Sequence, residues 1–205
     1  MPTVALKGDF GGSLAEFITS PAWPEFIPLY LESVNTDKYA KLLAAVEKTI
    51  ASGTKKQKGD SLEDLAECFL ESIKAFKVEK NLNTKTGELD RYLKVSRIPG
   101  TFLDDWPIYV PIECKNWKKP ADTREISILH TKAEKMRSSR GFMFSRCGVT
   151  GNESTDGWGQ IRDLFSSKGY VTLVFDLNDL RKIVDGESPL KMIEQQQSRV
   201  CLGLI

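Results

Sequence analysis

The sequence predicts an α/β (α+β) fold, in which a central mixed β-sheet is flanked by helices and preceded by a helical appendage. Three observations predict it. From Asp60 onward, helical and strand periodicities alternate in the order helix, strand, strand, strand, helix, strand, helix, strand. The length of 205 residues suits one well-buried core and is too short for two full domains. The composition, 40% hydrophobic and 28% charged, is that of a globular protein.

Residues 1–54 are predicted to form the helical appendage, and residues 55–205 the core. Within the appendage, residues 35–53 have the pattern of a helix, because Asn35 or Thr36 can cap it, Gly53 can end it, and its apolar residues share one face. A polar stretch, residues 54–60, separates this helix from the main body. The pattern leaves open whether the appendage packs on the core, contacts a substrate or dimerises.

The elements of the core follow in order. A helix is expected over residues 60–76, capped by Asp60 or Ser61, because its apolar side chains form a single stripe at a period near 3.6. Two strands joined by the turn NTKTG come next, and after a loop rich in Pro, Gly and Asp comes an apolar strand that ends in charged residues. The expected ranges are strands 77–82, 87–95 and 108–116, helix 122–139, strand 141–148, helix 157–168, strand 170–176 and helix 177–184.

Charge is unevenly distributed along the chain. The net charge is only +1, yet residues 114–146 carry nine cations against three acids, a local balance of +6 that leaves about −5 for the remainder. A basic region that follows a carboxylate-bearing strand suits a polyanionic substrate. Solvated helix faces are the alternative explanation of the same run.

Several classes of site are excluded by composition. The four cysteines are scattered and there is one histidine, so neither a zinc site nor a disulfide framework is indicated. Any catalysis must therefore rest mainly on carboxylates and lysines. The chain has no phosphate-binding G-x-x-x-x-G-K-[ST] loop, so no nucleotide cofactor is evident. No stretch is long and apolar enough for a membrane span, and the N-terminus has no secretory pattern, so we expect a cytoplasmic protein without a membrane partner.

The strand over residues 108–116 carries the candidate chemistry. Alternate residues of a strand share a face, so Glu113 and Lys115 leave it together, opposite to its apolar residues. Asp90 stands on the preceding strand, and if the two strands are neighbours Asp90 and Glu113 can converge with Lys115 beside them. Two carboxylates and the backbone carbonyl of Cys114 make a hard oxygen site of the kind that Mg²⁺ accepts.

The helix over residues 60–76 offers a further carboxylate. Glu63 lies on the edge of its apolar stripe and Glu67 slightly further round, so either side chain can reach over the sheet toward a metal. Glu63 is the first candidate and Glu67 the second. Both are equally well explained as ordinary exposed helix acids.

Four segments together resemble a known group of enzymes. Leu62 to Glu67 on the helix, Gly87 to Asp90 and Ile112 to Asn116 on two strands, and Phe144 to Arg146 on a later strand resemble the restriction-endonuclease-like, PD-(D/E)xK nuclease superfamily. The resemblance covers roughly residues 58–185, most of the chain. Leu89 replaces the proline of the motif, and the gap from Asp90 to Glu113 requires an inserted loop.

The resemblance implies a Mg²⁺-dependent DNA endonuclease, with Mn²⁺ able to substitute, that acts as a restriction enzyme or a defence effector. Asp90, Glu113 and the Cys114 carbonyl would hold the metal, Lys115 would position the attacking water or offset charge on the phosphate, and Glu63 would support a second metal. A homodimer is expected, because cutting both strands needs two active sites. The alternatives are a structure-specific nuclease such as a junction resolvase, or an inactive nucleic-acid-binding scaffold of the same fold.

Basic and aromatic residues around this centre are candidate contacts to DNA. Trp117 is suited to stacking on a sugar or base, although surface packing explains it equally well. The solitary His130, in the middle of a helix, is expected to be structural. The candidate nucleic-acid-binding residues are Asn116, Trp117, Lys118, Lys119, Arg124, Lys132 and Arg146.

Overall fold

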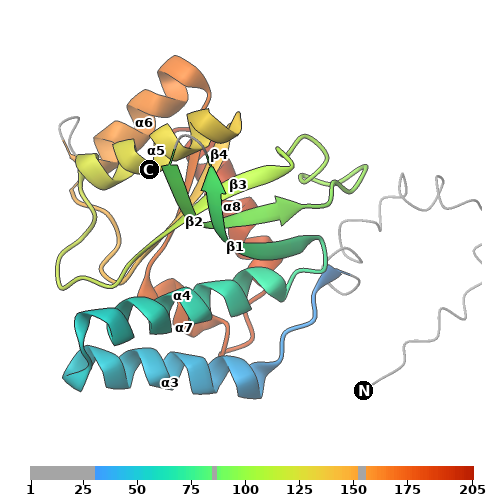
Figure 1. The fold of residues 1–205 in the computed structure, drawn as a ribbon. Coiled ribbons are helices and arrows are strands. Elements are labelled where there is room, and N and C mark those ends of the chain that lie inside the picture. The colour runs from blue at the N-terminus through green and yellow to red at the C-terminus, as the bar shows by residue number, and fades with distance from the viewer. Residues whose placement is uncertain (1–30, 85–86, 152–155) are drawn as a thin grey trace, which may run out of the picture.

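The computed structural model describes residues 31–84, 87–151 and 156–205, and the side chains of residues 81–90 are not among those described. The fold has five strands between helices, as the sequence predicts (Figure 1). No helix of the described chain is long and apolar enough to cross a membrane. The elements are α3 (Thr36–Ser52), α4 (Lys55–Glu71), β1 (Phe76–Thr84), β2 (Gly87–Val95), β3 (Tyr109–Lys115), α5 (Thr123–Met136), β4 (Arg140–Ser145), α6 (Gly157–Lys168), β5 (Val171–Phe175), α7 (Leu177–Lys182) and α8 (Pro189–Cys201).

The sheet is mixed, and its strands follow one another in chain order from β1 to β5. β1, β2 and β3 are antiparallel neighbours, whereas β3, β4 and β5 run parallel. β3 changes partner along its length: residues 109–111 pair with β2, and residues 112–115 pair with β4. The hairpin of β1 and β2 therefore joins the parallel part of the sheet through a short seam of three residue pairs.

Helices cover the sheet from two sides (Figure 1). α4 contacts β1 and β3, and α3 packs along α4. α5 contacts β3 and β4 and lies beside α6. From α3, Tyr39 and Val46 are fully buried, because they belong to the apolar face that the sequence indicates. The N-cap of α3 is Asn35, whose side chain accepts a hydrogen bond from Lys38 N, and its C-cap is Gly53.

α4 begins earlier than the sequence analysis predicts. The polar residues 54–60 are not a separator, since they form the cap and the first turns of α4. The physical reason is a capping box: the Thr54 hydroxyl accepts a hydrogen bond from Gln57 N, and the Gln57 side chain accepts one from Thr54 N. A helix can begin on polar residues when its first amide groups are satisfied in this way.

The core is aromatic at its centre and takes its largest residue from the predicted loop. Phe69 of α4 contacts the rings of Phe144 and Phe175 at centroid distances of 5.8 and 5.0 Å. Trp106, between β2 and β3, is fully buried and stacks on Phe76. Its indole Nε1 donates a hydrogen bond to the side chain of Gln197 in α8. α8, which the sequence analysis does not anticipate, thereby anchors the loop over residues 96–107.

His130 belongs to the buried face of α5, as expected of a structural residue. Its ring packs edge to face on Tyr170, and Nε2 lies 3.7 Å from a carboxylate oxygen of Glu134. Burial lowers the pKa of His130 below its usual value; Glu134 opposes this shift, and Lys168 adds to it.

This lowered pKa predicts a pH-dependent stability. The folded state binds the proton less readily than the unfolded state, so the contribution of neutral His130 is complete above the unfolded pKa of about 6.5 and is lost as the pH falls. We expect the melting temperature to rise between about pH 5 and about pH 8, and to rise less in His130→Phe, which keeps a ring against Tyr170. Calorimetry at both pH values measures this; an unchanged pH dependence in the variant would contradict it.

Candidate functional site

A carboxylate held between two lysines lies at the end of β3. Glu113 is buried, with 8% of its surface exposed. Its Oε1 lies 2.7 Å from Lys115 Nζ, and its Oε2 lies 2.8 Å from Lys132 Nζ of α5. Burying a carboxylate is costly unless opposite charges or hydrogen-bond donors compensate it, and here each oxygen has an ammonium group. The structure thus brings together Glu113, Lys115 and Lys132, which we call the Glu113 cluster.

The face on which this cluster lies follows from strand alternation. Glu113 contacts Lys132, so its side chain points toward α5. Cys114 must point the other way; its neighbour in register is Phe144, whose ring packs on Phe69 of α4. The Glu113 cluster is therefore on the α5 face of the sheet, and the aromatic core is on the α4 face.

Asp90 can be placed by its backbone only. It lies in β2, and its side chain is outside the described ones. β2 and β3 pair as Tyr92 with Pro111 and Lys94 with Tyr109. These pairs end at Tyr92 and Pro111. Only a continuation of the same antiparallel register by two further residues would place Asp90 opposite Glu113, so the convergence of the two carboxylates stays a prediction.

The helix carboxylates have a different neighbour. Glu63 Oε2 lies 2.9 Å from Nε and 2.8 Å from Nη2 of Arg91, and Glu67 Oε2 lies 2.5 Å from Nη1. The side chain of Arg91 leaves β2 on the α4 face. The structure therefore does not bring Glu63 or Glu67 onto the face of Glu113. Sequence reasoning missed Arg91. The signal was available, since Arg91 is the one cation on β2 in phase with the buried residues Leu93 and Val95.

Arg91 is expected to contribute more to stability than an exposed cation. Arg91→Met keeps the aliphatic volume but leaves two partly buried carboxylates without their shared guanidinium. Buried pairs cost roughly 3–5 kcal/mol when one partner is removed, and the 33% and 23% exposure of the Glu63 and Glu67 side chains lowers our expectation to about 1–3 kcal/mol. Urea unfolding measures the loss. Lys80→Met is the control, since Lys80 also pairs with Glu67 but is more exposed; an equal loss in both variants would contradict the special role of Arg91.

The pKa of the Cys114 thiol is affected by charged residues on both faces of the sheet. Burial raises the pKa of its thiol well above the usual range, the negative charges of Glu63 and Glu113 raise it further, and the positive charges of Arg91 and Lys115 lower it. The two groups of charges therefore lie close enough to act on one side chain. The thiol itself is a neutral packing group, while its backbone carbonyl remains the predicted metal ligand.

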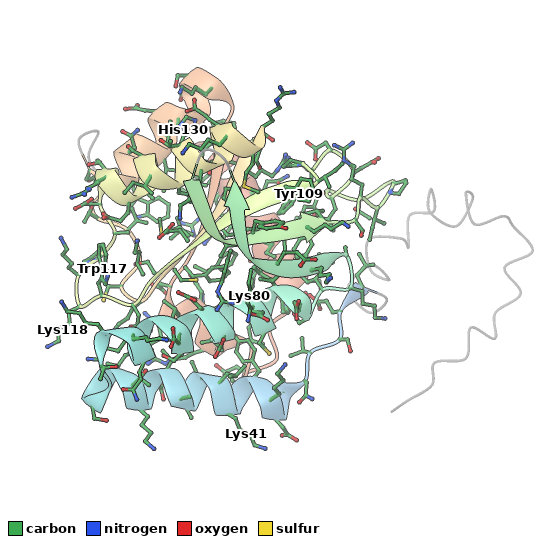
Figure 2. The ribbon with its side chains drawn as sticks, in the orientation of Figure 1. Lys41, Lys80, Tyr109, Trp117, Lys118 and His130 are labelled. Atoms are coloured by element: carbon green, nitrogen blue, oxygen red, sulfur yellow. The ribbon has the colours of Figure 1, made fainter. Side chains whose placement is uncertain are left out.

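The residues after β3 form a turn with two distinct roles. Asn116 Nδ2 donates a hydrogen bond of 2.7 Å to the backbone oxygen of Lys58, which ties the end of β3 to α4. Trp117 is exposed, and its ring lies 5.0 Å from Lys115 Nζ and 5.8 Å from Lys119 Nζ. Lys118 is exposed beside it (Figure 2). The structure thus places Asn116 in a structural bond and leaves Trp117, Lys118 and Lys119 on the surface next to the Glu113 cluster.

The remaining predicted contacts are spread out. Arg124 is exposed on the first turn of α5, and Arg146 is half-buried directly after β4. The backbone amide of Arg146 donates to Lys115 O, so this residue sits at the same end of the sheet as the Glu113 cluster. Lys132, which the sequence analysis assigns to DNA, instead has its ammonium group on Glu113.

The donor chemistry around Glu113 suits a magnesium ion in part. Ser145 pairs in register with Lys115, so it lies on the same face; it is buried, and its hydroxyl has no hydrogen-bond partner among the described residues. An unsatisfied buried hydroxyl on the same face as the Glu113 cluster fits a site that takes an additional polar group, such as a hydrated cation. Within the described residues no three acidic, Cys or His side chains gather around one point, and Asp90 stays the predicted second carboxylate.

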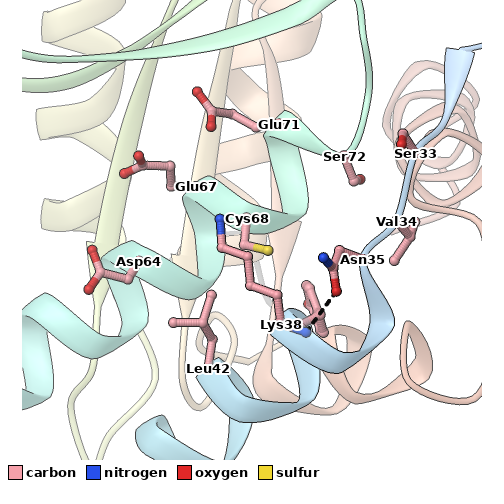
Figure 3. A pocket seen from close by; sticks show the side chains of 11 residues that line it. Ser33, Val34, Asn35, Lys38, Leu42, Asp64, Glu67, Cys68, Glu71 and Ser72 are labelled. Atoms are coloured by element: carbon pink, nitrogen blue, oxygen red, sulfur yellow. Dashed lines mark hydrogen bonds between the residues drawn. The ribbon is translucent and has the colours of Figure 1, made fainter.

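A separate cleft of about 390 Å³ lies between α3 and α4 (Figure 3). Lys38 from α3 and the acids of α4 line it, together with Cys68. Two of its carboxylates are engaged in the fold, since Glu67 binds Arg91 and Glu71 accepts a hydrogen bond from Val78 N. The cleft is therefore distinct from the Glu113 cluster, and its acids serve the packing of α4 on the hairpin.

We compared the chain with family models, curated proteins and solved structures, and none of them matches it.

Proposed function

We propose that the chain is a Mg²⁺-dependent DNA endonuclease that hydrolyses phosphodiester bonds, in the role of a restriction enzyme or defence effector. The observation that carries the proposal is the Glu113 cluster: a buried carboxylate with two lysines at the end of a central strand, followed by exposed basic and aromatic residues. Such a centre pairs a ligand for a hard cation with positive charge for a phosphate. Its position agrees with the residues that resemble the PD-(D/E)xK motif.

The chain's own residues would share the work as follows. Glu113, Asp90 and the Cys114 carbonyl would hold the ion, which when bound would polarise the phosphate and lower the pKa of a water. To admit it, at least one lysine has to leave the oxygen of Glu113 that it now holds. The released ammonium of Lys115 or Lys132 then lies beside the phosphate, where it offsets the negative charge that develops during attack.

DNA would be bound mainly by the surface at this end of the sheet. Lys118, Lys119 and Arg146 would contact backbone phosphates, and Trp117 would stack on a sugar or base. We expect a homodimer, since one such centre cuts one strand. A cytoplasmic location stays the expected one.

A second candidate is an inactive nucleic-acid-binding scaffold. The observation that favours it is that both Glu113 oxygens are already bonded to lysines, so that Lys115 and Lys132 compensate the charge of Glu113 without any metal ion. The two candidates share the same surface for nucleic acid, so binding alone does not separate them.

Incubation of the purified chain with supercoiled plasmid and with linear duplex, in Mg²⁺ or in EDTA, tests the proposal. Metal-dependent nicking or linearisation supports the nuclease. Binding without cutting, over a range of pH and with Mn²⁺ in place of Mg²⁺, favours the scaffold. Preference for branched over linear duplex would indicate the junction resolvase, and a difference between methylated and unmethylated plasmid would indicate restriction.

A further inference from the structure

The outer face of the β1–β2 hairpin carries aromatic and basic residues that the proposed site does not use. Val78 and Leu93 are buried on the α4 face, so their neighbours Lys77, Tyr92 and Lys94 point to the opposite side. The rings of Tyr92 and Tyr109 pack edge to face at 5.8 Å across the β2–β3 pair. We call these two residues the tyrosine pair.

The tyrosine pair is open to solvent. Tyr109 is 45% exposed, and Tyr92 is half-buried. α5 packs on β3 and β4, so the face of the hairpin lies beyond the edge of that helix. Aromatic rings that serve only packing gain most when they are covered, whereas an exposed pair with a flat ring face offers a stacking surface.

The pair is continuous with the Glu113 cluster. Tyr109, Pro111 and Glu113 alternate along the same face of β3, so the Cα atoms of Tyr109 and Glu113 are about 13 Å apart at roughly 3.3 Å per residue. Trp117 lies at the other end of the strand (Figure 2). Glu113 is thus flanked along β3 by an exposed aromatic residue on each side.

Lysines accompany the rings along this face. Lys77 and Lys94 are exposed opposite each other on β1 and β2, and Glu79, the acid beside them on the described part of these strands, is paired with Lys77 at 2.8 Å. At the other end of β3, Lys118 and Lys119 are exposed next to Trp117, so each aromatic end of the face has lysines beside it. Surfaces that bind single-stranded nucleic acid have this combination, since each base has a ring face to stack and each phosphate a charge to neutralise.

We infer that the tyrosine pair is a stacking platform for unpaired bases, so that the substrate at the Glu113 cluster is a DNA strand in single-stranded form, at an end, flap or opened junction. This inference rests on the proposed function, and it deepens that function by naming the form of DNA. In a closed duplex the base faces are stacked on each other and are not offered to a protein ring.

Binding measured without metal tests the inference separately from cutting. Fluorescence anisotropy in EDTA would compare labelled oligo(dT) of about 12 nucleotides, within the usual site size of single-strand binders, with a duplex of the same length. We expect tighter binding of the single strand, a loss of about 5- to 30-fold in Tyr109→Leu, and near wild-type binding in Tyr109→Phe, which keeps the ring. Leu202→Ala removes an even more exposed apolar side chain at the C-cap of α8 and is expected to change nothing.

The outcomes distinguish this inference from the proposed function. Equal binding of duplex and single strand, or equal binding by Tyr109→Leu and wild type, would overturn the platform even if plasmid is cut. Single-strand binding that depends on the ring, in a chain that cuts no DNA, would uphold the platform and reject the nuclease.

Discussion

Glu113→Gln is expected to abolish metal-dependent cutting. The amide has the shape of the carboxylate but not its charge, so it is a poor ligand for Mg²⁺ and leaves Lys115 and Lys132 without their shared anion. Lys115→Ala should lower the cutting rate by roughly 10²–10³-fold, the usual effect of removing a group that stabilises charge in a transition state. Initial rates of plasmid nicking in Mg²⁺ measure both.

Matched controls separate chemistry from charge and from folding. Glu134→Gln and Lys168→Ala remove an exposed acid and an exposed cation that pair with each other on α5 and α6, so they should leave the cutting rate nearly unchanged. Thermal unfolding of every variant shows whether it is folded at the assay temperature. If Glu113→Gln and Lys115→Ala are folded and cut plasmid at the wild-type rate, the Glu113 cluster is not the active site.

Trp106→Ala is expected to cause the largest loss of stability, about 3–5 kcal/mol. Trp106 is fully buried and contacts the rings of Phe76, Phe102 and Phe142, so its removal leaves a large cavity. It also deprives Arg140 of the ring beneath its guanidinium, at 5.3 Å.

Urea unfolding at neutral pH measures this loss. Ile108→Ala, nearby in the chain but about half exposed, is the control and should cost less than about 1 kcal/mol. A similar small cost in both variants would show that residues 96–107 do not belong to the core. Trp106→Phe should recover part of the stability, because a ring remains but the hydrogen bond to Gln197 is lost.

Periodicity predicted most of the elements because burial leaves a regular pattern in the sequence. The stripe of α3 and the continuous apolar runs of β4 and β5 are direct consequences of burial on one face or on both, and their positions agree with the structure within a few residues. The start of α4 was wrong because a capping box satisfies the first amides without any apolar residue. Trp106 lies in the predicted loop, but its burial was not predictable, because nothing in a local pattern shows that a distant helix will cover it.

Only the part of the candidate site that lies on β3 was predictable from the sequence. Glu113 and Lys115 are neighbours on one strand, so alternation alone put their side chains together. Lys132 and Arg91 come from other elements, and their contacts depend on how α5 and α4 cross the sheet. A local pattern carries no information on such crossings, so the contact of Lys132 with Glu113 was not predictable. Alternation in β2 puts Arg91 on the face of the buried residues, but it does not show which helix acids Arg91 meets.

The hairpin is joined to the parallel strands by a short seam, and on one face it is held by the ion pairs of Lys80 and Arg91 with α4. Three residue pairs hold β2 to β3, so a small rotation there would change the spacing between opposing positions farther along both strands while the parallel strands stay in place. The affinity of the site for a divalent ion would then depend on the angle between the hairpin and the parallel strands as well as on the ligands themselves. A strand of DNA that contacts both the hairpin and the parallel strands would fix that angle. The binding of DNA and the binding of the ion would then be coupled.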